Sequence, residues 1–164
     1  MYLVSILALF IMLVFMCIIQ GLELTYLIDL PSILLILLIT IPILMSTGLF
    51  RDFNNAFRLG MRKKEENVTL RELKRAVEAV SLAIRTILLS GVLVSVIQCV
   101  AILRNLDDPS FLGPMLSLAI LVIVYAMGLA LLLLPLRTRL KIKMIEYLAD
   151  AGNDVENDIE KDAE

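Results

Sequence analysis

The chain has 164 residues, of which 60% are hydrophobic, and its mean hydropathy is +0.91. This composition excludes a soluble globular enzyme, and the lack of histidine removes the commonest general base and metal ligand. The net charge of −2 is uneven, because residues 146–164 carry eight acidic residues and one lysine while the preceding part is net basic. We therefore expect a membrane body with basic flanks and an acidic tail.

Four apolar stretches are long enough to cross a bilayer, for which about 20 residues suffice. We place them at about residues 1–19, 33–50, 84–103 and 111–136, the second being interrupted by Pro42. The first stretch has no charged residue, no basic segment before it and no good cleavage site after it. We interpret it as an uncleaved helix rather than a signal peptide. The sequence therefore predicts an all-α, multi-pass protein with four transmembrane helices.

Lysine and arginine concentrate in two of the connecting segments. Eight of them lie between the second and third spans and four directly follow the fourth span, whereas the other two loops hold only Arg104. Basic loops stay on the cytoplasmic side, so we expect both chain ends in the cytoplasm and the protein in the inner (cytoplasmic) membrane. The basic loop sets this topology and contacts anionic lipid. It lacks the interleaved aromatic residues of a nucleic-acid-binding module, so no nucleic-acid partner is expected.

The cytoplasmic loop contains a helix start. Asn54, Asn55 and Gly60 are expected to loosen the chain, whereas Thr69 and Glu72 have the Thr-x-x-Glu spacing of a capping box. A helix over 70–103 would be about 50 Å long, which exceeds a bilayer core of about 30 Å. Its first turns should therefore project into the cytoplasm as an amphipathic collar.

These boundaries divide the chain into two parts. Residues 1–148 form a four-helix transmembrane domain, with helices at about 1–19, 33–50, 70–103 and 111–143. Residues 149–164 are polar and acidic and contain two residues that break helices, so we expect a disordered tail.

Three polar or small residues share one stripe of the third span. Gly91, Ser95 and Gln98 are spaced at i, i+4 and i+7, and Gln98 is the most polar group at membrane depth on the outer side. One interpretation is a helix–helix contact, with Gly91 and Ser95 as a small-xxx-small pair and Gln98 bonded to a neighbouring helix. The other is the lining of a pore.

The fourth span has a small-residue face of its own. Ala119, Ala126 and Ala130 lie on it, flanked by Val122 and Ile123, which together favour close helix packing. Tyr125 lies midway along the span, so its hydroxyl should find a partner.

Charged groups are sparse at membrane depth. Arg85 is expected at the cytoplasmic interface, either as an anchor whose guanidinium reaches the interface or as a functional group. Asp29 precedes the second span, and no acidic residue lies within a span, so a carboxylate for proton movement would have to come from a partner. The sequence also has no nucleophile–base pair and no metal-binding cluster, so we expect neither an enzyme nor a cofactor.

Two segments have distinctive sequences at the ends of predicted spans. Residues 26–34, which include Asp29, Pro31 and Ser32, enter the second span, and residues 50–57 follow it. Residues 108–114 enter the fourth span and are followed by Tyr125, Gly128 and Pro135. These segments resemble the entry and exit of helix two, and the entry and proline-containing exit of helix four, in the MotA family of flagellar stator subunits, which is related to ExbB and TolQ. The resemblance covers about residues 1–143 and includes the order and orientation of the helices.

The resemblance implies a mechanism. Such subunits form a homo-oligomeric ring, usually a pentamer, in which helices three and four surround single helices of a MotB-like partner that carries the essential aspartate. Ion flow past that aspartate is thought to rotate the ring or to drive work at the envelope. By this resemblance, Pro114 and Pro135 would shape the ends of helix four. The inner-ring and partner-contacting residues would be drawn from the following set: Gly91, Ser95, Gln98, Pro114, Ala119, Val122, Ile123, Tyr125 and Ala126.

The chain departs from the family pattern in two respects. Only about 30 residues join the second and third spans here, whereas MotA proteins carry a large cytoplasmic domain there that engages the rotor. Val122 and Ile123 stand where the family has threonines along the ion path. A ring that does not conduct and acts as a scaffold for a partner helix or lipid is therefore an alternative, and an unrelated four-helix membrane protein is a third.

Overall fold

The computed structural model describes residues 7, 8, 11, 12, 15, 19, 29–61, 69–104 and 109–162. Within these ranges the chain is all-helical, with α3 (Leu30–Ser46), α4 (Phe50–Met61), α5 (Leu70–Arg104) and α6 (Pro109–Asp162) in that order. The first predicted span, at residues 1–19, lies outside the described residues apart from the six single positions above.

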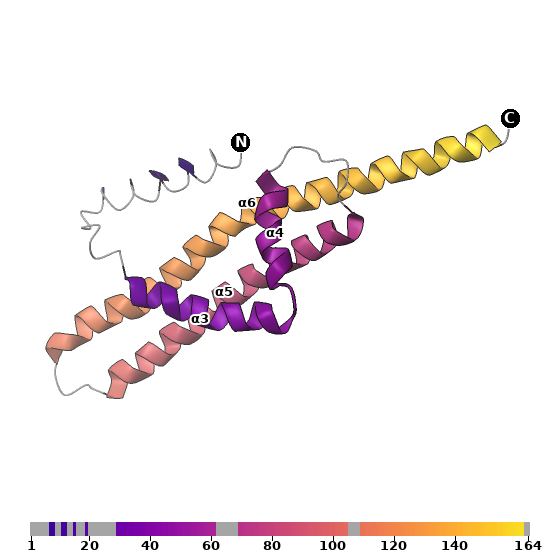
Figure 1. Cartoon of the computed structure of the whole chain (residues 1–164). Helices are drawn as coiled ribbons and strands as arrows, with labels where there is room; N and C mark the ends of the chain where they lie inside the picture. The colour runs from indigo at the N-terminus through magenta and orange to yellow at the C-terminus, as the bar shows by residue number, and fades with distance from the viewer. Residues whose placement is uncertain are drawn as a thin grey trace.

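Helices α5 and α6 form a long antiparallel hairpin, and α3 lies across one side of it (Figure 1). Two helical stretches are long and apolar enough to cross a membrane, namely Leu70–Arg104 and Leu112–Ala149. The bent pair α3 and α4 makes a third if it counts as one span. The fold is therefore that of a helical membrane protein.

The start of α5 follows directly from its sequence. The Thr69 N–H donates to Glu72 Oε2 at 3.3 Å, and the Glu72 N–H donates to Thr69 Oγ1 at 3.4 Å. The predicted capping box is thus confirmed, and it satisfies two N–H groups that the first helical turn would otherwise leave unpaired. The helix continues for 35 residues, so it is about 52 Å long and extends well beyond a bilayer core.

The second span differs from its predicted extent of 33–50. Helix α3 starts three residues earlier, with Pro31 in its first turn, and ends at Ser46. The Leu49 N–H donates to the Leu44 carbonyl at 3.1 Å, and the Gly48 N–H donates to the Met45 carbonyl at 3.0 Å. These two bonds are those of a Schellman motif, which requires a left-handed residue after the helix. Gly48 supplies it with a φ of +69°.

Directly after this turn the chain enters α4, at 102° to α3. Asn54, Asn55 and Gly60, which were expected to loosen the chain, lie inside this helix. The expectation was wrong because the segment has a helical apolar period: Phe53, Ala56 and Gly60 face the protein, and Ala56 is completely buried. An amphipathic helix therefore forms where a loose loop was predicted.

Helix α4 joins the first turns of α5 to the second half of α6. Its Asp52 Oδ2 lies 3.2 Å from Arg75 Nε on α5, and its Leu59 carbonyl accepts a hydrogen bond of 2.6 Å from Lys143 Nζ on α6. Gly60 packs so closely against Leu136 that an added Cβ would overlap that side chain. Helix α4 therefore bridges α5 and α6 beside the first turns of α5, which are the predicted collar. We refer to α4 below as the crossbar.

Helix α6 is longer than its predicted extent of 111–143. Its backbone is helical from Pro109 to Asp162 and passes through both Pro114 and Pro135, so neither proline ends it. The backbone of 149–162 thus differs from the predicted disordered tail. A helix that already exists extends at low cost, since each further residue adds one hydrogen bond.

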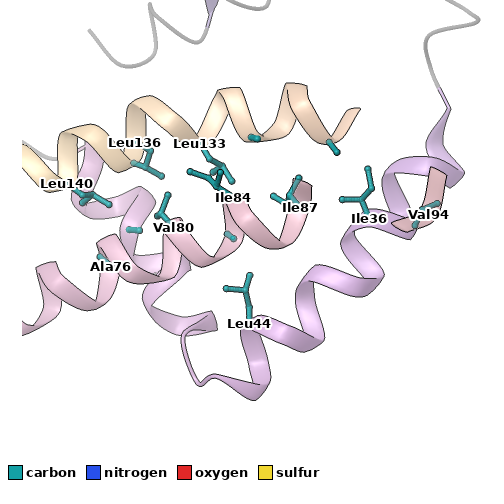
Figure 2. Close-up of a cluster of buried hydrophobic side chains, with 14 of the residues drawn as sticks. Ile36, Leu44, Ala76, Val80, Ile84, Ile87, Val94, Leu133, Leu136 and Leu140 are labelled. Atoms are coloured by element: carbon teal, nitrogen blue, oxygen red, sulfur yellow. The ribbon is translucent and has the colours of Figure 1, made fainter. Parts of the chain in front are cut away.

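The core lies between α5 and α6, with one side closed by α3 and α4. Leu133, Leu136 and Leu140 of α6 point toward Val80 and Ile84 of α5 (Figure 2). Ile36 and Leu44 belong to the same buried cluster and come from α3. The core therefore joins α3 to the α5–α6 hairpin and, with Ala56 of α4, includes residues of all four described helices.

The turn at Gly48 gives the first prediction. Gly48→Ala should destabilise the protein by about 1–2 kcal/mol, because an L-residue pays that cost in the left-handed region, and a Cβ at this position meets no atom within 4 Å. Unfolding by titration with a denaturing detergent would measure the change. Gly113→Ala is the control, because a Cβ there also meets nothing within 4 Å but the φ of Gly113 is not positive. Equal stability of Gly48→Ala and Gly113→Ala would contradict this role of the turn.

Candidate functional site

The middle of the α5–α6 hairpin contains most of the candidate site residues. A Cβ added to Gly91 would overlap the Ala126 Cβ and would lie 3.6 Å from the Val122 carbonyl oxygen. Ser95 is also buried, at 6% exposure, and so are Ala119, Val122 and Ala126, at 0–1%. The small residues of the two helices thus face one another within a single chain.

This arrangement has a physical reason. Lipid tails are as apolar as a leucine side chain, so membrane helices gain little from burying large apolar groups and instead gain from close backbone approach. Gly91 on one helix and Ala126 on the other allow that approach. The geometry is the helix–helix contact that was one of the two interpretations of Gly91 and Ser95.

Hydroxyl groups on the helices bond to their own backbone. The Thr86 hydroxyl donates to the Leu82 carbonyl at 2.8 Å, and the Ser90 hydroxyl donates to the Ile87 carbonyl at 2.9 Å. Thr40 of α3 does the same with the Ile36 carbonyl at 2.8 Å. Such internal bonds satisfy a polar side chain at membrane depth without water.

Tyr125 joins α6 to the start of α3. Its hydroxyl accepts a hydrogen bond of 2.8 Å from the Asp29 N–H, which confirms the prediction that this deep hydroxyl finds a partner. The Ser32 hydroxyl in turn donates to the Asp29 carboxylate. A polar junction of three residues thus fixes the N-terminal end of α3 against the first third of α6.

Two polar atoms lie buried in the hairpin with no hydrogen-bond partner in the part of the chain that the structure describes. They are Gln98 Oε1 on α5 and Arg137 Nε on α6. A buried acceptor or donor without a partner costs about 1–3 kcal/mol. Each atom is therefore a place where a group from outside the described chain could bind.

The remaining candidates lie at the edges of this arrangement. Arg85 is exposed, Pro114 is exposed on the first turns of α6, and Ile123 is half-buried beside Val122. Sequence reasoning missed the crossbar α4, although Phe53, Ala56 and Gly60 already show a helical period. Among the described residues, no group of acidic or cysteine side chains is placed to hold a metal ion.

The fold and this packing define an all-helical membrane protein whose small residues join two long apolar helices. No family model matches the chain, and no curated protein matches it in sequence. Its function is therefore argued from the geometry and from the two motif segments.

The close contact at Gly91 gives the second prediction. Gly91→Ala should destabilise the protein by about 1–3 kcal/mol, which is typical of overpacking, because the new methyl group overlaps Ala126. The double variant Gly91→Ala with Ala126→Gly should recover most of that loss, since the extra volume then has room. Detergent-induced unfolding would measure both changes.

Gly128→Ala is the matched control for this experiment. A Cβ at Gly128 meets no atom within 4 Å, so alanine there should leave stability unchanged or raise it slightly. If Gly91→Ala and Gly128→Ala behaved alike, the close approach of α5 and α6 at Gly91 would be refuted.

The junction at Tyr125 gives the third prediction. Tyr125→Phe removes the acceptor of the Asp29 N–H, so the protein should lose about 1 kcal/mol and the amide of Asp29 should exchange faster with solvent deuterium. Hydrogen exchange measured by mass spectrometry would detect the local effect at the start of α3. Unchanged exchange there, with Leu73 in the collar as a reference region, would argue against the tether.

Proposed function

We propose that the chain is a MotA-like ring subunit of an ion-driven membrane motor or energiser complex in the inner membrane. In this proposal several copies, with five as the expected number, surround the transmembrane helices of a MotB-like partner, each partner chain contributing one helix. The partner supplies the carboxylate that the ion passes. The proposal makes the chain a component of a motor and not an enzyme.

One observation carries this proposal. The two segments that resemble the family are far apart in the sequence, yet they meet in the structure, since the Asp29 N–H of the first bonds to the Tyr125 hydroxyl of the second. Ser32 completes the junction by bonding to Asp29. Because the two segments that resemble the family also contact each other, together they support a MotA-like architecture more strongly than either segment does alone.

The surfaces that the hairpin leaves exposed are consistent with a ring. Large apolar side chains on the outer side of α5 remain exposed, among them Leu89 at 71%, Val100 at 62% and Leu103 at 65%. In a membrane these faces contact lipid, neighbouring copies or a partner helix. Gln98 Oε1 adds a buried acceptor that a donor from a partner would satisfy.

A ring that does not conduct is the second candidate function. Val122 is completely buried at the position where the family has a threonine, and the Thr86 and Ser90 hydroxyls are bonded to their own helix. The hairpin interior therefore offers few free oxygen atoms to an ion. In this second proposal the ring is a scaffold that holds a partner helix or lipid.

Native mass spectrometry of the protein in lipid nanodiscs tests the ring directly. The proposal expects one closed oligomer of defined size, with five copies as the leading expectation. A monomer or a simple dimer would contradict both the motor proposal and the scaffold proposal. Proton or sodium flux into vesicles, measured with the partner chain present and absent, would then separate the two ring proposals.

The fourth prediction concerns Gln98. Gln98→Leu should weaken binding of the single-helix partner about threefold, the effect of an average interhelical hydrogen bond in a membrane, or should reduce ion flux by a similar factor. Co-purification with the partner and flux in vesicles would measure the two effects. Ile97→Leu, at an exposed neighbouring position, is the control. If Gln98→Leu matched the unaltered chain in both assays, Gln98 would have no such role.

A further inference from the structure

Helix α4 makes a sharp bend with the apolar helix that precedes it. Helix α3 is apolar, and α4 leaves it at 102° through the Gly48 turn. A span that crosses the bilayer and then turns by about a right angle continues along the plane of the membrane. The contacts of α4 with Arg75 and Lys143 hold it against the basic collar, which the sequence assigns to the cytoplasmic side.

Three stripes run along α4 at 100° per residue. Ala56 and Gly60 are buried against the collar. Phe50, Phe53 and Phe57 form a neighbouring aromatic edge, in which the last two rings make an edge-to-face contact of 5.4 Å and Phe50 is 45% exposed. Phe53 and Phe57 pack against the core, so Phe50 is the side chain of this edge that can reach the acyl chains, as on a helix that lies in a membrane interface.

The third stripe carries two arginines. Arg51 and Arg58 are both exposed, and their spacing of seven residues places them on one line about 10 Å apart. Neither guanidinium makes a hydrogen bond or ion pair to the described part of the chain. Asp52, the one acidic residue in the sequence of α4, is already paired with Arg75. Within the described residues, the two positive charges of this stripe therefore have no acidic partner.

We propose that α4 binds anionic phospholipids of the cytoplasmic leaflet, with Arg51 and Arg58 on the headgroup phosphates and Phe50 at the level of the first acyl carbons. The charges of the stripe are complementary to lipid phosphate, and an arginine fork bonds two phosphate oxygens at once. This binding holds the crossbar at the membrane surface whether or not the chain forms a ring.

A single fluorophore tests this binding. The chain has no tryptophan, so Phe50→Trp introduces a unique reporter on the aromatic edge of α4. The full-length variant is reconstituted into vesicles of phosphatidylcholine and phosphatidylglycerol in which only one of the two lipids carries brominated acyl chains. We expect stronger quenching by brominated phosphatidylglycerol than by brominated phosphatidylcholine, which gives the relative affinity of α4 for the anionic lipid.

Two charge variants in the Phe50→Trp background test whether Arg51 and Arg58 bind the anionic lipid. Arg51→Gln with Arg58→Gln should lower the relative affinity for phosphatidylglycerol at least about fivefold. Arg104→Gln removes a positive charge from an exposed position at the other end of α5 and should leave the preference intact. Equal quenching by the two lipids would overturn the proposal, and so would absence of quenching or an equal effect of the two charge variants.

Discussion

The close approach of α5 and α6 at Gly91 is the constraint on which the rest of the structure depends. Within a bilayer the usual gain from removing apolar surface from water is absent, so helix association relies on backbone proximity and on satisfied polar groups. Gly91 against Ala126, with Val122 beside them, provides that proximity. Larger apolar residues elsewhere on the two helices either belong to the buried core or remain exposed on the outer faces of the hairpin.

The remaining helices are arranged around this hairpin by a few specific bonds. Tyr125 holds the start of α3, the Gly48 turn ends it, and α4 then crosses both members of the hairpin. Asp52 with Arg75 and Leu59 with Lys143 fasten the crossbar to one helix each. Motion of α5 relative to α6 at the end of the hairpin that α4 crosses would therefore be transmitted to α4, and through its turn to α3.

Much of this arrangement could be predicted from local sequence, and the successes have local causes. The capping box at Thr69 and Glu72 depends on residues three positions apart, and the length of α5 follows from an unbroken apolar pattern. The small-residue face of α6 was also recognised from its period, and its alanines are buried. In each of these cases the feature is determined by residues that lie within a few positions of one another in the sequence.

The parts that sequence could not settle depend on neighbours. The spacing of Gly91 and Ser95 places them on one face, but a period cannot tell whether α6 of the same chain or another chain covers that face. The partner of Tyr125 lies 96 residues away, so no local pattern could identify it. Helix α4 was missed because Asn54, Asn55 and Gly60 have low helix propensity, which tertiary packing of Ala56 and Gly60 overrides.

Cryo-electron microscopy of the protein in lipid nanodiscs tests the central claim most directly, because it shows which surface covers Gly91. The account predicts that Gly91 packs against Ala126 of the same chain, that α4 lies along the membrane surface, and that copies associate through the outer faces of the hairpin. A map in which Gly91 faces the α6 helix of a neighbouring copy, or an open aqueous path, would contradict it.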